Sequence, residues 1–498
     1  MGDLTPLIAV LTPAIASLLI LASHKNPNVR EFWTILATFI AFPLVFSMVP
    51  KVLNGESIEC ILFEILPGIE FAFKVDAFGM IFAITSSSLW ILVSIYSIGY
   101  MRSLNEHAQT RYYFCFAWAI ASALGIAFSK NLITFFIFYE ILTICTYPLV
   151  SHEESEEALA AGRKYLLYLM TSGSFLLAAS LITYVLVDTT DFKPGGVLGI
   201  GISKTLLQLL FICYLLGFMK AAFMPFHSWL PTAMIAPTPV SALLHAVAVV
   251  KAGVFGVIRV ICYIYGVKMT NELGLGFLLA IFASFTVITA NLLAIGENNL
   301  KRRLAYSTIN QLSFIILGAS LLSPLALMGA MMHITFHGYM KITLFLCAGA
   351  IAVVTGKKLV SELAGVGKSM PITMLAFTIG AIGMAGLPPI AGFLGKWYIA
   401  IGSVQAAEIF NQPILVSFIP VILISSILDI LYLLPIVKMA FFEGSSESFG
   451  REEMKQKLYL FMLIPLCTTA LFSILLFIFP NILLIPELAE VAVDEICK

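Results

Sequence analysis

Two proline-rich stretches, Met-Pro-Phe-His-Ser-Trp-Leu-Pro at 224–231 and Gly-Met-Ala-Gly-Leu-Pro-Pro-Ile-Ala-Gly at 383–392, interrupt segments that are otherwise apolar. Proline removes a backbone donor and clashes with the preceding helical turn. In a bilayer such backbone survives only where it is buried in protein or lines a wet cavity. The stretches therefore predict broken membrane helices beside a polar path, and ordinary proline kinks are the plainer alternative.

The composition indicates an integral membrane protein. Of the 498 residues, 60% are hydrophobic and only 11% are charged, whereas about 25% are charged in a soluble domain. The mean hydropathy is +1.00. The 28 Lys and Arg balance the 28 Asp and Glu, so no basic surplus exists for a nucleic acid and we expect no such partner. The expected surrounding is a lipid bilayer.

Segments long enough to cross a bilayer recur along the whole chain. A crossing needs about 20 apolar residues. The sequence predicts an all-α membrane protein with about fourteen transmembrane helices, at 5–23, 33–53, 76–99, 112–128, 130–150, 163–187, 205–224, 240–262, 273–295, 303–322, 324–352, 371–400, 415–440 and 458–480.

The two interrupted spans are the seventh and the twelfth, five spans apart. A five-helix unit makes an odd number of crossings, so a second copy inserts with inverted topology, and broken helices at matching positions indicate an ion site. We expect three helices in 1–111, a first inverted repeat of helices 4–8 in 112–262, and a second repeat of helices 9–13 in 263–440. Residues 441–498 then hold helix 14 and a tail.

Loop charges predict the orientation. Fourteen loop Lys and Arg residues fall on one side of the predicted membrane and eight on the other, and cytoplasmic loops carry the excess. We expect a multi-pass protein of the cell (plasma) membrane with both termini outside. The first span carries Asp3 at its head, which argues against a cleaved signal peptide.

Motifs for cofactor chemistry do not occur in the sequence. None of the eight cysteines forms a Cys-x-x-Cys pair, and there is no dinucleotide fingerprint or Walker loop. We therefore expect no cofactor, no metal and no redox catalysis by this chain itself.

Six lysines lie within or near the ends of predicted spans, and a position near a span end does not readily explain four of them. These four are Lys220, Lys251, Lys341 and Lys396. A charge at the bilayer centre costs at least ~2.5–3.5 kcal/mol, so these lysines are candidate functional residues. Lys220 precedes the proline-rich break at 224–231, and Lys396 follows the break at 383–392. Lys164 lies near a span end, where snorkelling to the headgroups explains it equally well.

Two acids are predicted to be embedded. Glu140 lies in the middle of the fifth span, where an ionised carboxylate needs a cation, and we expect an embedded lysine to supply it. Asp429 lies in the thirteenth span. Its partner is either Lys396 or a neighbouring subunit, and the sequence leaves both open.

Histidines add a titratable element to the predicted path. His333, His337 and Lys341 are spaced i, i+4, i+8 and share one helix face. Because histidine titrates near neutrality, this face favours a proton relay. His245 lies six residues before the eighth-span lysine, and His227 lies within the first break and is a further candidate.

Four motifs together resemble one membrane-protein superfamily. They are Pro-Phe-His-Ser-Trp-Leu-Pro at 225–231, Ala-Pro-Thr-Pro-Val-Ser-Ala-Leu-Leu-His at 236–245, Leu-Lys-Arg-Arg-Leu-Ala-Tyr-Ser-Thr-Ile at 300–309 and Gly-Leu-Pro-Pro-Ile-Ala-Gly-Phe-Leu-Gly-Lys at 386–396. The chain resembles the antiporter-like subunits of complex I, Mrp antiporters, membrane-bound hydrogenases and sulfur reductases. Since it stops after the predicted fourteenth span, it looks most like the Mrp D-subunit branch.

The resemblance implies roles for the embedded residues. In the first half, it implies that Glu140 is the coupling glutamate, that Lys220 is its partner lysine, and that Lys251 is the central lysine with His245 nearby. In the second half, it implies that His333, His337 and Lys341 form a relay and that Lys396 is the terminal lysine.

The expected function is proton translocation in a multisubunit membrane complex, with the Glu140–Lys220 pair as a switch. The resemblance implies coupling to redox chemistry or Na⁺/H⁺ exchange in partner membrane subunits, with a hydrogenase-like or sulfur reductase-like peripheral arm in some relatives. The alternatives are a sodium pathway, a stand-alone solute transporter and a structural scaffold.

Overall fold

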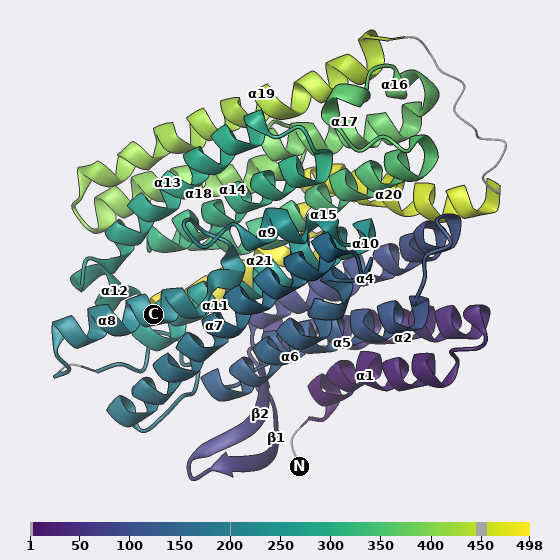
Figure 1. Ribbon diagram of the computed structural model, residues 1–498. Coiled ribbons are helices and arrows are strands. Elements are labelled where there is room, and N and C mark those ends of the chain that lie inside the picture. The colour runs from purple at the N-terminus through teal and green to yellow at the C-terminus, as the bar shows by residue number, and fades with distance from the viewer. Residues whose placement is uncertain (1–2, 200, 445–455) are drawn as a thin grey trace.

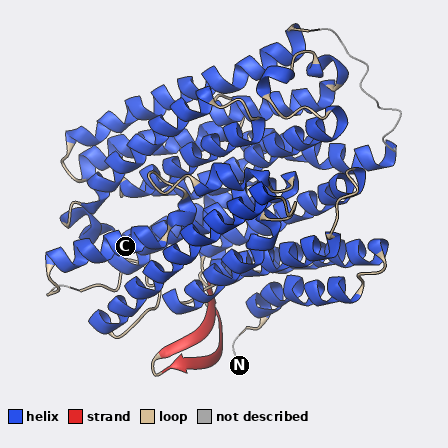
Figure 2. Cartoon of the chain, in the orientation of Figure 1, coloured by secondary structure: helices blue, strands red, loops and turns tan. Residues whose placement is uncertain are grey.

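The computed structural model describes residues 3–199, 201–444 and 456–498. Long helices lie side by side through the whole molecule, and a single hairpin of strands projects from them (Figures 1 and 2). The first half comprises α1 (Thr5–Ala22), α2 (Pro27–Ser47), α3 (Val49–Leu53), β1 (Ile58–Leu66), β2 (Ile69–Val75), α4 (Ala77–Ser103), α5 (Gln109–Ala127), α6 (Leu132–Val150), α7 (Glu156–Val187), α8 (Lys204–Gly217), η1 (Met219–Ala221), α9 (Trp229–Thr232), η2 (Ala233–Ile235), α10 (Thr238–Leu243), η3 (Leu244–Ala248), α11 (Val249–Arg259) and η4 (Val260–Tyr265).

The described residues of the second half form helices joined by loops, with no strand among them. It comprises α12 (Val267–Glu272), α13 (Leu275–Gly296), α14 (Leu300–Ser320), α15 (Pro324–Thr355), η5 (Val360–Glu362), α16 (Val366–Ser369), α17 (Pro371–Ala385), α18 (Gly392–Ile409), η6 (Pro413–Ser417), α19 (Phe418–Phe442), α20 (Gln456–Ile478), η7 (Pro480–Leu483) and α21 (Ile485–Cys497).

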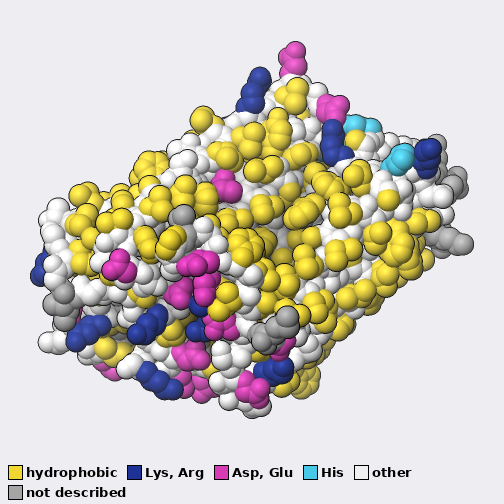
Figure 3. Space-filling model, turned by 90° about the horizontal axis from the view of Figure 1, so that it is seen from below, with side chains coloured by type: hydrophobic (Ala, Val, Ile, Leu, Met, Phe, Trp, Pro, Cys, Tyr) yellow, Lys and Arg dark blue, Asp and Glu magenta, His cyan; other side chains and the backbone are white. Residues whose placement is uncertain are grey.

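Each of the fourteen predicted spans contains a helix of the structure. In the described part, ten helices are long and apolar enough to cross a membrane. On the face shown in Figure 3, apolar side chains cover most of the middle, and most charged side chains lie toward the two ends. The protein is therefore a multi-pass membrane protein, as predicted, whereas the full count of fourteen crossings and the inverted repeats stay predictions.

Both predicted breaks are confirmed. In the first, α8 ends at Gly217, and only short helical pieces follow before α10 begins at Thr238. In the second, α17 ends at Ala385 and α18 begins at Gly392. The interrupted helices α8 and α17 are correspondingly short, with 14 and 15 residues.

The hairpin is an addition that the all-α prediction did not contain. Strands β1 and β2 pair antiparallel, with Ile58 opposite Val75. The chain reverses at Gly68, whose φ of 79° suits glycine. The strands are largely apolar but are interrupted by Glu59, Glu64, Glu70 and Lys74. They lie between the second and third predicted spans, so a search for apolar runs of membrane-spanning length passes over them.

The predicted C-terminal tail is also ordered. Its residues form α21, which packs against α4 and α15. The buried side chains of this helix include Leu488 and Ala492. These two residues are four positions apart and share one face, so α21 buries an apolar stripe against the helix bundle.

Candidate functional site

The first break places a lysine inside the protein. Lys220 lies on η1 and is completely buried. Its ammonium donates to the Tyr139 carbonyl and lies 3.3 Å from the centroid of the Tyr139 ring. A desolvated cation over an aromatic face is stabilised by about 2 kcal/mol. The break thus presents one ammonium to α6.

Neighbouring side chains satisfy the backbone groups that the break frees. Ser172 and Tyr139 donate to the Gly217 carbonyl at 2.6 and 3.1 Å. The Ser172 hydroxyl also accepts from the Met219 amide, and Trp229 Nε1 donates to the Met219 carbonyl, both at 3.1 Å. Interrupted backbone inside a membrane needs such partners, so these residues explain why the helix can stop here.

Glu140 follows Tyr139 on α6. Both of its carboxylate oxygens are buried, and they have no hydrogen-bond partner in the described part of the chain. The expected ion pair with Lys220 is therefore not formed in this structure, because the lysine bonds instead to the carbonyl one residue earlier. The acid rests against Gly173 of α7, where a Cβ atom would lie 2.1 Å from Oε1.

The eighth predicted span carries the central lysine and a local change of helical geometry. Residues Leu244–Ala248 form the π-helical turn η3, which contains His245. Such turns occur frequently at functional sites. Lys251 follows on α11, is fully buried, and donates to the Ile334 carbonyl of α15. His245 is also buried, with both ring nitrogens unpartnered among the described residues.

Helix α15 carries the predicted relay. His333, His337 and Lys341 are all fully buried on it. The two imidazole rings are nearly parallel, with centroids 6.0 Å apart. His333 Nε2 lies 2.9 Å from Gln311 Oε1 on α14. The Lys341 ammonium has no hydrogen-bond partner in the described chain. Of these three side chains, His333 is therefore the one whose hydrogen bond connects α15 to α14.

The second break brings Lys396 to Asp429, which settles the partner that the sequence left open. The ammonium lies 3.0 Å from Asp429 Oδ2 and also donates to the Met384 carbonyl and the Ser426 hydroxyl. Gly386, at a φ of 76°, leaves room for the lysine stem, because a Cβ atom there would lie 2.6 Å from Lys396 Cδ. Both charges are buried.

A cluster of neutral polar side chains surrounds the Asp429 carboxylate. Asn310 donates to Oδ1 at 2.9 Å, Gln311 donates to Oδ2 at 3.1 Å, and the Tyr432 hydroxyl donates to Oδ1 at 2.5 Å. Asn291 accepts a bond from Asn310 at 2.7 Å. The sequence analysis missed these residues. The adjacent amides at 310–311, inside an apolar span and next to a quoted motif, are the signal that could have found them.

Two of the three lesser candidates, Lys164 and His227, lie at the first break, and the third is Asp429. Lys164 is half-buried, and its ammonium lies 3.2 Å from the Thr232 hydroxyl of α9. It therefore contacts the broken segment. His227 is half-buried in the break, with Nδ1 unpartnered among the described residues.

Three arginines that the sequence analysis counted as loop charges are buried, namely Arg30, Arg259 and Arg303, and Arg259 is the most deeply buried of them. Arg259 ends α11, is 1% exposed, and pairs with Asp76, with Nη2 2.8 Å from Oδ1. Its guanidinium lies within 5.3 Å of the centroids of four aromatic rings. The loop assignment was wrong because this charge is neutralised within the protein. Asp76 also caps α4 by accepting from the Gly79 amide.

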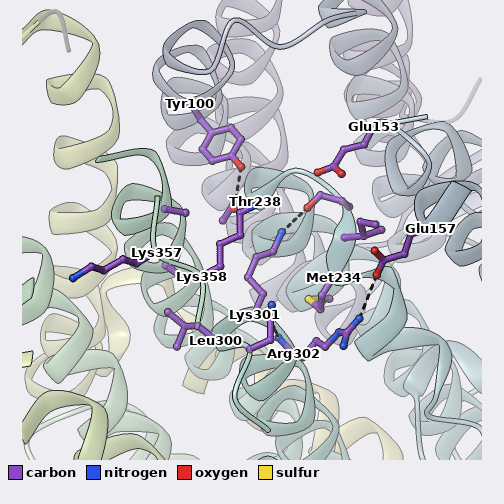
Figure 4. Close-up of a pocket in the computed structure, with 15 residues that line it drawn as sticks. Tyr100, Glu153, Glu157, Met234, Thr238, Leu300, Lys301, Arg302, Lys357 and Lys358 are labelled. Atoms are coloured by element: carbon purple, nitrogen blue, oxygen red, sulfur yellow. Dashed lines mark hydrogen bonds and ion pairs between the residues drawn. The ribbon is translucent and has the colours of Figure 1, made fainter. Parts of the chain in front are cut away.

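A cavity of about 250 Å³ opens where α10 begins. Its lining includes Tyr100, Glu153, Thr238 and Lys301 (Figure 4). The Lys301 ammonium donates to the Ala236 carbonyl at 2.7 Å, and Thr238 bonds to the Tyr100 hydroxyl at 3.3 Å. The cavity thus lies between the first break and α14, and its lining includes Lys301, Arg302, Lys357 and Lys358.

Comparison with known proteins shows the family to which this chain is related. Residues 129–422 match the family model described as NADH:quinone oxidoreductase/Mrp antiporter, TM, and 67–113 match that of the N-terminus of complex I chain 5. The chain belongs to this family. It is 30% identical over 394 residues to NADH-quinone oxidoreductase subunit N of Desulforudis audaxviator, covering 78% of this chain and 75% of that protein.

Some relatives in the family are longer than this chain. It is 29% identical over 488 residues to the putative antiporter subunit mnhA2 of Staphylococcus haemolyticus, and the match covers 92% of this chain but only 59% of that protein. Against F(420)H(2) dehydrogenase subunit L of Methanosarcina mazei it is 28% identical over 502 residues, covering 93% of this chain and 72% of that protein. The likeness to the D-subunit branch stays a prediction.

Two solved assemblies contain chains of the same fold. One is the Mrp complex from Dietzia sp. DQ12-45-1b, with a TM-score of 0.84 at 20% identity, covering 99% of this chain and 97% of that one. The other is the membrane-bound sulfane sulfur reductase, an archaeal respiratory membrane complex, with a TM-score of 0.84 at 22% identity and coverages of 99% and 98%. Both are multisubunit complexes.

Proposed function

We propose that this chain translocates protons across a membrane as the antiporter-like subunit of a multisubunit complex. The observation that carries the proposal is the bonded line from His333 through Gln311 and Asp429 to Lys396. It joins α15, α14, α19 and α18 inside the protein. A scaffold gains nothing from desolvating these charges.

The first half of the path runs from Glu140 to the central lysine. Gly253 of α11 packs so closely on η1 that a Cβ atom would lie 2.2 Å from the Ala221 amide nitrogen. The segment holding Lys220 therefore touches the helix that carries Lys251. From there, the bond to the Ile334 carbonyl reaches α15 beside His333 and His337.

The switch is the changing separation of Glu140 and Lys220. With the pair closed, the carboxylate stabilises the charged lysine; with the pair open, as here, the buried ammonium favours passing its proton onward. Breaking a buried pair is worth about 3–5 kcal/mol, whereas moving one charge against 100 mV takes about 2.3 kcal/mol. The electrostatic change is therefore large enough to drive a proton.

The cavity at Thr238 is the proposed mouth of the path. His245 follows Thr238 by seven residues, a rise of about 10 Å along the helix. The mouth opens on the side with more Lys and Arg, which we assign to the cytoplasm. Both termini then face outward, and the chain resides in the plasma membrane.

The partners are other membrane subunits of a complex I-like or Mrp-like assembly, with a hydrogenase-like or sulfur reductase-like arm as one form of it. Redox chemistry or Na⁺/H⁺ exchange in those partners drives the proton path. Residues 112–262 and 263–440 form the two inverted halves that carry it. No cofactor is needed by this chain.

Proton uptake by vesicles containing the intact complex tests the proposal. The complex is purified through a tag on this chain, which also identifies its neighbours. Lys220→Ala and Glu140→Ala should each abolish uptake while the complex still assembles, and Lys193→Ala, at an exposed loop lysine, should not. Full uptake by either axis variant would disprove the proposed path.

Sodium transport is the second candidate, because Asp429 gathers several oxygen-bearing side chains. The Lys396 ammonium already lies 3.0 Å from Asp429 Oδ2, and its positive charge repels a second cation at this carboxylate. Protons therefore suit this site better. Transport that requires sodium and is lost in both Asp429→Asn and Glu140→Gln would favour the sodium pathway instead.

A further inference from the structure

Three potential metal ligands converge in two loops outside the buried path. Glu106 and His107 lie between α4 and α5, and His152 lies between α6 and α7. One ligand atom from each residue can be chosen so that all three lie within 4.8 Å of one another. Glu106 Oε2 lies 3.9 Å from His107 Nδ1 and 3.7 Å from His152 Nε2.

The cluster contains a buried imidazole without a hydrogen-bonding partner. His152 is 0% exposed, and both of its ring nitrogens lack a hydrogen bond within the described residues. Its ring stacks on that of His107, with centroids 4.8 Å apart. Burial of such a ring is costly unless another group takes up its lone pair, and a metal ion is one such group.

The backbone of the first loop is held in place. The Glu106 amide donates to the Met101 carbonyl at 3.0 Å, and Gln109 Nε2 donates to the Glu106 carbonyl at 3.0 Å. Arg30 bonds to Gln109 Oε1 at 2.7 Å. The carboxylate is therefore presented to the histidines by a loop that α2 and α4 support.

The surrounding charges allow a divalent cation. Arg111 is the nearest cation on α5, and its Nη1 pairs with Glu154 at 2.5 Å. Its Nη2 donates to the His152 carbonyl at 3.3 Å, which leaves the ring free to point at Glu106. With that arginine balanced, the Glu106 carboxylate supplies the negative charge of the cluster, and Lys358 is a further cation that acts on it.

We propose that Glu106, His107 and His152 form a binding site for a Zn²⁺-class transition metal ion. Two imidazoles and one carboxylate form a ligand set that zinc accepts, with water in the fourth position. Tetrahedral zinc keeps its ligand atoms about 3.3–3.5 Å apart. Glu106 Oε2 would therefore approach the two histidine nitrogens by a fraction of an ångström, and ligand atoms as far as 4.8 Å apart would close by about 1.3–1.5 Å. Water reaches the fourth position past His107, whose side chain is 48% exposed.

The site fastens two walls of the cavity proposed as the mouth. Glu153, next to His152, lines that cavity, as does Tyr100 near the end of α4. A bound ion would link the loops after α4 and α6 and restrict their movement. This consequence, a Zn²⁺-dependent slowing of proton uptake, rests on the proposed function; the binding site itself does not.

Calorimetric titration of the purified full chain with Zn²⁺ tests the site. We expect one binding event that His107→Ala and Glu106→Gln each weaken at least about tenfold, because both side chains are partly exposed and their loss should be tolerated. His24→Ala, at an exposed histidine of another loop, is the control and should bind as the parent does. Mg²⁺, which prefers six oxygen ligands, should not compete.

Equal Zn²⁺ affinity in the parent, His107→Ala and Glu106→Gln would overturn the site. A second measurement separates the site from the mouth. If the variants lose Zn²⁺ binding and the parent's proton uptake slows with Zn²⁺ only while the site is intact, both assignments are supported. If binding behaves as expected and Zn²⁺ leaves uptake unchanged, the metal site is supported and the assigned mouth is overturned.

Discussion

The Lys396 ammonium lies 3.0 Å from the Asp429 carboxylate, and the pair is closed, while Lys220 and Glu140 at the other break are not paired. The two breaks therefore hold their lysines in different electrostatic states within one structure. One lysine has a carboxylate partner, and the other has only a carbonyl and an aromatic ring.

Asp429→Asn should destabilise the protein and stop proton uptake. The change keeps the size of the side chain but leaves a buried ammonium without its anion, which costs about 3–5 kcal/mol. Thermal unfolding of the purified chain measures the stability. Ser426→Ala is the control, because it removes one neutral acceptor of Lys396 and should cost only about 0.5–1.5 kcal/mol.

The pair can be separated from its surroundings by a double-variant cycle. Lys396→Met combined with Asp429→Asn removes both charges, so much of the lost stability should return while uptake stays absent. Uptake that returned with the stability would show that the pair only supports the fold.

Gly173→Ala should inactivate the first half of the path without a charge change. The added methyl group would lie 2.1 Å from Glu140 Oε1, so the carboxylate must move away from α7. We expect proton uptake to fall about as far as it does in Glu140→Gln. Gly296→Ala, where the added methyl group meets nothing within 4 Å, should retain full uptake, and equal activity of the two alanine variants would refute the steric argument.

Gln311→Met should interrupt the bonded line at its middle. The side chain keeps nearly the same length but loses the bonds to His333 and Asp429. Leaving buried partners unsatisfied costs about 1–3 kcal/mol, so assembly should survive while proton uptake falls at least about tenfold. Uptake at the parental rate would mean that protons bypass this amide.

Lys130→Met should loosen the β1–β2 hairpin. Lys130 pairs with Glu59 at 2.6 Å and Glu70 at 2.7 Å. Burial alone would lower the pKa of Lys130, but the bonds to these two acids outweigh it and raise the pKa above its usual value. The stabilisation of the hairpin by protonated Lys130 is therefore complete below about pH 10.4, the usual pKa of lysine. It is lost only as the pH rises through the raised pKa of Lys130.

Hydrogen exchange of the strand amides measures this effect. Exposed pairs contribute only about 0.2–1 kcal/mol each, so we expect faster exchange confined to the hairpin and little change in global unfolding. Lys193→Met, at an exposed lysine of a nearby loop, is the control. Unchanged strand exchange in Lys130→Met would show that packing alone holds the hairpin.

Sequence reasoning recovered the parts of the fold that depend on local composition. Apolar length located a helix for every predicted span, and the prolines located both breaks, because each feature acts within a few residues of chain. The embedded lysines and histidines were found for the same reason, since a charge inside an apolar run is visible without knowing its neighbours. Their assigned roles stay predictions.

What the sequence could not give depends on contacts between distant segments. Gln311 became part of the site only when folding placed it between His333 and Asp429. Arg259 looked like a loop charge because its anion comes from the start of α4. The Glu106 and His152 cluster also joins two separate loops, so no spacing pattern reveals it.

The side chains that secure the first break have a consequence for how the protein can operate. Ser172, Tyr139 and Trp229 hold the Gly217 and Met219 carbonyls through neutral donors. None of these bonds depends on whether Lys220 carries a proton. The backbone of this interruption is therefore held by bonds that do not depend on charge, so at this break the proposed switch requires only the Lys220 and Glu140 side chains to move.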